Sequence, residues 1–256
     1  MNWKVFALAM LACFATTVAN AQDGPQNINV VTIKINPGGQ AAFEAFMTKY
    51  REAVEKNEDD RTWLVSTNAI GPVTQYTISS LMPSFAALDN PPNPIASMIQ
   101  AFGEEEAMAI SASLQGIVAE TNGRAWIARP DLSRPIESDD TPVGVTVIFI
   151  DINPGAASVF ETYGKQLVEA SNKMDDGNWA MATGAPGAPS DYLVTIPIFK
   201  WADLDTPQGM PLRERMIAAF GERNGAKMYA QGVASIENIT TSLLRTRPDL
   251  SRPPPE

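Results

Sequence analysis

A long internal repeat constrains this chain more than any other feature. Three segments of the first half return in the same order in the second half, 117 or 118 residues later. They are VTIKINPG at 31–38 and IFIDINPG at 148–155, MIQAFGE at 98–104 and MIAAFGE at 216–222, and RPDLSRP at both 129–135 and 247–253. A period of this length is typical of a duplicated domain, not of a solenoid. The sequence therefore predicts one domain written twice.

The predicted boundaries follow from where the matching stops. Copy one covers 27–135 and copy two covers 143–253, with an acidic linker at 136–142 and a proline-rich tail at 254–256.

Each copy is predicted to contain two helical regions among four strands. The first strand is followed by a helix with Asn36 or Asn153 as its N-cap and proline at its first position, where a missing N–H costs nothing. A glycine, Gly103 or Gly221, should break the second helical region. The expected strands are 28–35, 63–67, 73–81 and 124–128 in copy one and 145–152, 179–183, 191–196 and 242–246 in copy two.

This β-α-β-β-α-β order at this length is the ferredoxin-like layout, an α+β fold. The first strand is apolar on both sides, with Val31, Ile33 and Ile35 on one face and Ile28 and Val30 on the other. Helices can cover only one face of such a sheet, so the second face needs another cover. We therefore expect two tandem ferredoxin-like units whose sheets pack into one pseudo-dimeric α/β barrel, within a monomer.

This arrangement resembles the dimeric α/β-barrel superfamily, which includes antibiotic-biosynthesis monooxygenase-like and NIPSNAP-like proteins. The resemblance rests on element order and duplication, and it implies a tandem fused repeat in an exported bacterial protein. It carries over no functional residue. The haem-degrading branch of the superfamily relies on an axial histidine, and this chain has none.

Composition excludes several classes of function. The formal net charge is −10, and an acidic surface repels phosphate backbones, so nucleic acid is not an expected partner. The absence of histidine removes Ser-His-Asp and Cys-His catalysis and histidine-containing zinc sites. No metal-ligand spacing, phosphate loop or nucleophile elbow is present. The sequence therefore predicts no catalytic motif, no metal and no cofactor.

The N-terminus has the pattern of an export signal. A short positive start is followed by an apolar stretch at 5–18 and by Ala19-Asn20-Ala21, which suits signal peptidase. We expect residues 1–21 to be a signal peptide and the mature protein to be periplasmic or secreted, with no membrane span. The alternative is a lipoprotein anchored at Cys13, in a segment that resembles a lipobox.

The repeated RPDLSRP segments allow two interpretations. Arg129 and Arg247, with their neighbouring Asp and Arg residues, could clamp an anionic ligand, because guanidinium groups match carboxylates. Alternatively the segment ends a strand: proline stops it, Asp131 and serine cap a turn, Leu132 plugs the barrel end, and arginine pairs with aspartate. The second interpretation is favoured.

Other candidate residues also allow two interpretations. Aromatic residues on the predicted strands could line a pocket for a flat apolar ligand or fill the core, and the core is favoured; they are Trp63, Tyr76, Trp126, Trp179 and Tyr192. Three carboxylates recur in both copies and could act as general bases, although surface charge or capping is favoured; they are Glu44 with Glu161, Asp89 with Asp205, and Glu104 with Glu222.

Two functional classes remain open. The favoured one is a non-catalytic exported module that binds a small apolar or anionic ligand, or a protein partner. The alternative is a cofactor-independent oxygenase or isomerase of the dimeric α/β-barrel type.

Overall fold

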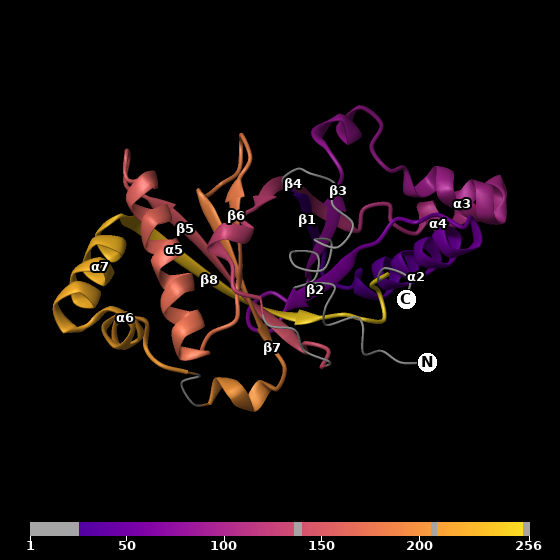
Figure 1. Cartoon of the computed structure of the whole chain (residues 1–256). Coiled ribbons are helices and arrows are strands. Elements are labelled where there is room, and N and C mark those ends of the chain that lie inside the picture. Colours follow the sequence, from indigo (N-terminus) through magenta and orange to yellow (C-terminus); the bar gives the residue numbers. More distant parts are fainter. Residues whose placement is uncertain (1–25, 136–139, 206–208, 253–256) are drawn as a thin grey trace. The chain divides into compact units, whose positions relative to one another are not determined.

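A computed structural model describes residues 26–135, 140–205 and 209–252 (Figure 1). The predicted signal peptide, part of the linker and the tail at 254–256 lie outside the described residues. The chain divides into two compact units. The first unit contains residues 26–125 and the C-terminal segment from Leu244, and the second contains residues 126–243.

The first unit is an antiparallel sheet with helices on one face. Its hydrogen-bonded order is β4-β1-β3-β2-β8, of which β4 and β8 are only partly in this unit. Its elements are β1 (Asn27–Ile35), α2 (Gln40–Lys56), β2 (Leu64–Asn68), β3 (Gln75–Met82), η3 (Phe85–Asp89), α3 (Pro94–Phe102), α4 (Glu104–Ala112) and β4 (Val118–Ala128).

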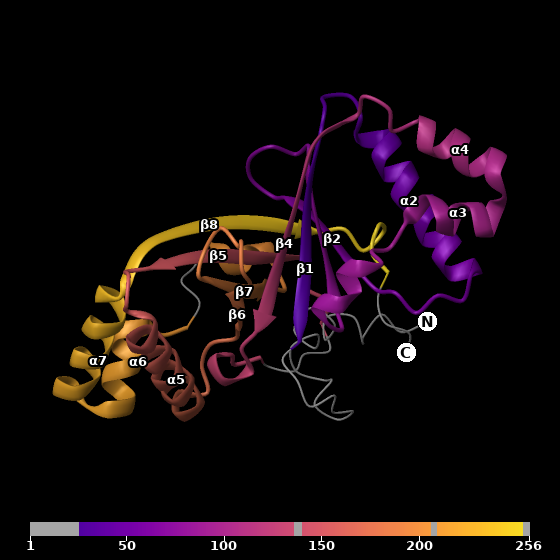
Figure 2. The ribbon, with the colours of Figure 1, turned by 90° about the horizontal axis from the view of Figure 1, so that it is seen from above.

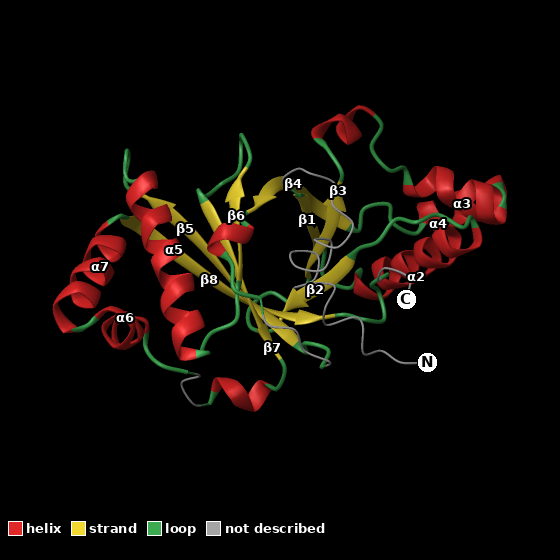
Figure 3. Ribbon diagram, viewed as in Figure 1, coloured by secondary structure: helices red, strands yellow, loops and turns green. Residues whose placement is uncertain are grey.

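The second unit has the same order of strands and helices (Figures 1 and 3). Its strands follow the order β8-β5-β7-β6-β4. Its elements are η4 (Pro130–Leu132), β5 (Gly144–Ile152), α5 (Ala157–Met174), β6 (Ala180–Gly184), β7 (Tyr192–Ile198), η5 (Trp201–Leu204), α6 (Leu212–Phe220), α7 (Glu222–Ala234) and β8 (Ile236–Thr246). The described residues therefore form a mixed α+β fold of eight strands.

The last strand of each half divides between the two units. The end of β4 pairs with β6, with Trp126 opposite Gly184 and Ala128 opposite Ala182. The end of β8 pairs with β2, with Ser66 opposite Thr246. Both long strands are visible in Figure 2. Each compact unit therefore contains the strand end and exit segment of the other half, and the repeat boundaries 27–135 and 143–253 stay a prediction.

The residues after the first strand form a turn, so the predicted N-cap at Asn36 is wrong. The Gly39 N–H donates to the Asn36 carbonyl at 3.0 Å, and Gly38 has φ of +88°. Pro-Gly in the middle of a turn with positive φ at glycine is the type II pattern, which cannot continue as an α-helix. Helix α2 therefore begins at Gln40, and the Asn36 side chain donates to the Gly116 carbonyl at 2.8 Å.

The second helical region breaks at the predicted glycines. Gly103 separates α3 from α4 with φ of +90°, and Gly221 separates α6 from α7 with φ of +83°. Helix α4 ends at Ala112, and β4 begins at Val118. Gly116, with φ of +71°, reverses the chain between them.

Both units bury an apolar helix face against the sheet. In the first unit Phe43, Tyr76 and Leu250 are buried together, and in the second Phe160, Tyr192 and Leu132 are buried in the same way. Leucines from the two exit segments are thus core residues, with exposed fractions of 0% for Leu132 and 2% for Leu250.

The two cores distribute their volume differently. Met47 on α2 and Val65 on β2 are buried in the first unit, where the second unit has Gly164 and Met181 at the matching positions. A Cβ atom on Gly164 would lie 3.1 Å from a Leu132 methyl. A large residue on the sheet therefore compensates for a small one on the helix, as close packing requires.

No helix in the described part of the chain is long and apolar enough to cross a membrane.

The divided strands predict how a separated half behaves. A fragment of residues 27–138 keeps the end of β4 but lacks β6, its pairing partner. We expect this fragment to form a homodimer or to aggregate, because the bare strand end and Leu132 must find a second copy. Light scattering after gel filtration measures its mass. A fragment ending at Ala125 is the control: it lacks the strand end and Leu132, so it should associate less than the 27–138 fragment. A stable monomer of 27–138 would contradict the prediction.

Candidate functional site

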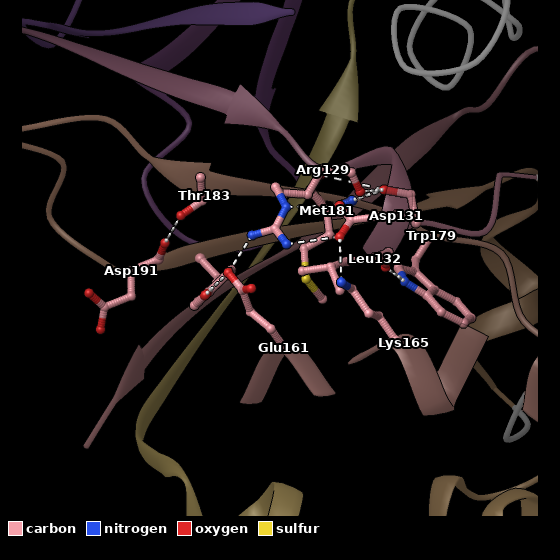
Figure 4. A network of polar contacts seen from close by, with 11 residues as sticks. Arg129, Asp131, Leu132, Glu161, Lys165, Trp179, Met181, Thr183 and Asp191 are labelled. Atoms are coloured by element: carbon pink, nitrogen blue, oxygen red, sulfur yellow. Dashed lines mark hydrogen bonds and ion pairs between the residues drawn. The ribbon is translucent and has the colours of Figure 1, made fainter. Parts of the chain in front are cut away.

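An arginine-centred network lies where β4 leaves the sheet of the second unit (Figure 4). Arg129 binds Asp131 through two hydrogen bonds, from Nε to Oδ1 at 2.8 Å and from Nη2 to Oδ2 at 2.9 Å. Its third nitrogen, Nη1, donates to Oε1 of Glu161 on helix α5. This guanidinium therefore joins the exit segment to α5.

Two further side chains complete this Arg129 network. The Tyr192 hydroxyl, at the start of β7, donates to the same Glu161 oxygen at 2.9 Å. Lys165, one turn further along α5, places Nζ 3.5 Å from Asp131 Oδ2. Three elements of the second unit, η4, α5 and β7, therefore meet around Arg129.

The first unit contains the matching Arg247 network. Arg247 donates Nε and Nη2 to Asp249 at 2.9 and 2.7 Å, and Nη1 to Glu44 Oε1 at 2.5 Å. The Tyr76 hydroxyl donates to the same Glu44 oxygen at 2.6 Å. Arg51 here donates to the Asp249 carbonyl at 2.7 Å, whereas Lys165 contacts a side chain in the other network.

Both networks hold charge in a fixed pattern. The hydrogen bond from Arg129 lowers the pKa of Glu161, and the one from Arg247 lowers the pKa of Glu44. Burial, and then the bond to Glu161, raises the pKa of Tyr192 to about 12. Burial and the bond to Glu44 likewise raise the pKa of Tyr76. At neutral pH the carboxylates are therefore ionised and the tyrosines protonated.

The geometry does not favour an anion clamp. Each central arginine already faces two carboxylates, so its charge and donors are engaged. An incoming anion would have to displace Asp131 or Glu161. The pairing of arginine with aspartate is instead the one expected for a strand exit.

In Glu161 and in Glu44, one carboxylate oxygen forms hydrogen bonds within the network and the other is left without one among the described residues. Oε1 of Glu161 and of Glu44 accepts both the arginine and the tyrosine bonds, whereas Oε2 has no hydrogen bond to any described residue. The side chains are 33% and 32% exposed. A carboxylate held at one oxygen and open at the other can accept a proton from a bound molecule.

The candidate aromatic residues are buried in the two units. The indole N–H of Trp63 donates to the Leu250 carbonyl at 3.0 Å, and that of Trp179 donates to the Leu132 carbonyl at 2.8 Å. The Trp126 ring lies 5.9 Å from that of Phe149. Tyr192 and Tyr76 thus join arginine networks, whereas the three tryptophans pack elsewhere in their units.

Ser133 and Arg134, which follow Leu132 in the exit segment, hold that segment in place. The Ser133 hydroxyl donates to the Arg129 carbonyl at 2.7 Å and accepts from the Met181 N–H at 2.8 Å. Arg134 donates to Asn172 at 2.9 Å. The expected turn cap by Asp131 is wrong, because its carboxylate accepts from side chains, mainly Arg129, which satisfies both oxygens.

Sequence reasoning missed two cations. Lys165 has no basic counterpart in the first copy, where Thr48 stands at the matching position. Arg215 is 4% exposed and binds Asp176 at 2.8 Å and Ser171 at 3.0 Å. The matching residue in the first copy is Ser97, so comparing the two copies did not single out Arg215 as a functional or structural residue. Within the described ranges, no three potential metal ligands gather into a cluster.

Neither a protein-family model nor a curated protein sequence matches this chain. Solved structures do match its fold. A candidate monooxygenase from Lactobacillus acidophilus has a TM-score of 0.53 at 8% identity, covering 90% of this chain and 97% of its own. A candidate monooxygenase from Fusobacterium nucleatum has 0.53 at 12%, covering 88% and 94%. Chlorite dismutase from Candidatus Nitrospira defluvii has 0.51 at 7%, covering 88% and 92%.

These likenesses correct the functional prediction. The non-catalytic module favoured by the sequence is wrong, because the structures that share the fold are described as monooxygenases and a chlorite dismutase. They fit the alternative, an enzyme, better. At this level of identity the likeness shows the fold alone. In fold, this chain is similar to proteins of the dimeric α/β-barrel, ferredoxin-like superfamily.

The networks predict that removing Arg129 destabilises the protein more than removing Lys165. Arg129→Ala leaves Asp131 and Glu161 without their main partner and should lower the free energy of unfolding by about 1–3 kcal/mol. Arg247→Ala should behave alike. Lys165→Ala is the control and should cost below about 0.5 kcal/mol, because Nζ is exposed and distant. Urea unfolding measures all three. An unchanged midpoint in both arginine variants would speak against structural networks.

Acid should weaken the fold through the same groups. The arginines lower the pKa values of Asp131, Glu161, Glu44 and Asp249 below their ordinary values of 3.8 and 4.5. The unfolded chain therefore binds these protons at higher pH than the folded chain. Their contribution is complete above about pH 5 and is lost as the pH falls through the lowered values.

Urea unfolding between pH 7 and pH 3 measures this loss. The doubly substituted Arg129→Ala, Arg247→Ala protein should show a flatter decline than the unsubstituted protein. Identical slopes would show that the networks do not set the acid response.

Proposed function

We propose that this chain is a cofactor-independent oxygenase or isomerase of the dimeric α/β-barrel type. The observation that best supports this proposal is the similarity in fold to candidate monooxygenases, which extends over about nine-tenths of both chains. A histidine-bound haem does not fit, because the 256 residues contain no histidine.

The chemistry of such an enzyme begins at the substrate. Removing a proton next to a carbonyl or from an aromatic hydroxyl gives an electron-rich anion. Returning the proton to another carbon completes an isomerisation. Alternatively the anion transfers one electron to O₂, the two radicals combine, and the resulting peroxide loses water to leave a carbonyl group. The substrate supplies every electron, so the protein needs only a base, a binding surface and exclusion of water.

Glu161 and Glu44 are the proposed bases. Each keeps Oε2 open, and each holds Oε1 against a protonated tyrosine and an arginine. Because their pKa values are lowered, they are weak bases and suit an acidic proton. The substrate class is therefore a phenol, a hydroquinone or a 1,3-dicarbonyl compound.

Two further parts of the proposal rest on the sequence. The paired segments at a 117–118-residue offset support a tandem fusion of two ferredoxin-like units. The pattern of residues 1–21 supports export to the periplasm or the medium after cleavage behind Ala21. N-terminal sequencing of the protein from its own host tests the cleavage, and a lipid on Cys13 would overturn it.

Oxygen uptake and proton exchange test the activity. Dihydroxynaphthalenes and 1,3-dicarbonyl compounds are mixed with the protein in an oxygen electrode and, without oxygen, in D₂O for NMR. An oxygenase should consume one O₂ per product formed. An isomerase should speed deuterium incorporation without oxygen uptake. If no compound in the panel shows oxygen uptake or faster deuterium incorporation, the proposal is overturned.

Matched variants locate the bases. Glu161→Gln and Glu44→Gln keep the shape of the side chain but remove the proton acceptor. Each should lower kcat by about 10²-fold or more at its own site, and the double variant should be inactive. Glu169→Gln, on the same helix and paired with Lys173 in solvent, should leave activity unchanged. Full activity in the double variant would remove these residues from the mechanism.

A further inference from the structure

One strand stretch of the first unit is exposed on both faces and along one edge. Residues Val118–Gly123 of β4 are all exposed. β4 has β1 on one side, and its pairing with β6 on the other begins only at Trp126. The edge before Trp126 therefore presents unpaired backbone groups, which can pair with another strand.

The charges on this edge are self-complementary. Side chains alternate along a strand, so Glu120, Asn122 and Arg124 share one face. Asn122 donates to Glu120 Oε1 at 2.7 Å, and within the described ranges neither Glu120 nor Arg124 forms an ion pair. If two copies pair antiparallel about Asn122, each Glu120 lies opposite the Arg124 of the other copy. Opposite charges directly across an antiparallel pair are favourable, whereas like charges are not.

The matching edge in the second unit lacks this property. Residues 237–241 of β8 are also exposed, but Glu237 is their only charged residue. Self-pairing there would bring no opposite charge to Glu237. The complementarity is therefore specific to β4.

We propose that two copies of this chain associate through the edge of β4, antiparallel and centred on Asn122. The partner is a second copy because the charge pattern is complementary to its own reverse: Glu120 of each copy lies opposite Arg124 of the other. Charged residues can instead guard an edge against pairing, and they do so when the facing charges repel. Here the register about Asn122 makes them attract. The sequence alone favoured a monomer, so this inference changes the expected assembly.

Sedimentation velocity over a range of protein concentrations at physiological salt measures the association. The unsubstituted protein should shift from monomer to dimer as concentration rises, and hydrogen exchange at 118–125 should slow in parallel. Glu120→Arg places arginine opposite arginine and should weaken dimerisation by about tenfold or more. The swap Glu120→Arg with Arg124→Glu should restore it. Glu237→Arg is the control and should change nothing.

Each outcome decides the proposal. A monomer at all concentrations overturns it, and so does a dimer that survives Glu120→Arg. Association that Glu237→Arg abolishes would place the interface on β8. Glu120 and Glu237 are exposed and Arg124 is half-buried, and thermal melts should show the fold retained in all variants.

Discussion

The exchanged strand ends are the constraint on which the rest of the structure depends. Leu132 comes from the first half of the sequence but fills the core of the second unit. Leu250 comes from the second half but fills the core of the first unit. Removing either segment would leave a hole under a helix and an unpaired edge at β6 or β2. The backbone pairs of Trp126–Ala128 and Leu244–Thr246 fix the register in which those leucines arrive. Packing and hydrogen bonding are therefore satisfied together.

The arginine networks serve this constraint and supply the candidate chemistry. Arg129 and Arg247 clamp the exit segments to helices α5 and α2 through glutamates that also accept from buried tyrosines. Only one oxygen of each glutamate is needed for that bond. The other oxygen has no hydrogen bond to a described residue, and the side chain is about one-third exposed, so a structural clamp can also present a base. Low pKa values limit such a base to acidic substrates, and this links stability to the proposed reaction.

Function was harder to infer than layout, for a physical reason. Recurrent carboxylates Glu44 and Glu161 were visible as a pair in the sequence, yet they read as surface charge because nothing local showed the arginines that contact them. The absence of histidine then favoured a binding module. Enzymes that draw electrons from their own substrate need few conspicuous residues, so a missing motif is weak evidence against catalysis.

The sequence by itself determined the repeated order of elements, the glycine breaks at Gly103 and Gly221, and the local pairing of arginine with aspartate two residues away. These depend on local propensity and on apolar periodicity, which are written in neighbouring residues. Only the tertiary structure decided the turn that replaces the Asn36 cap, the partners of Lys165 and Arg215, and the exchange of strand ends. Those choices depend on groups tens to hundreds of residues apart, whose contacts form only when the sheet edges and helices pack.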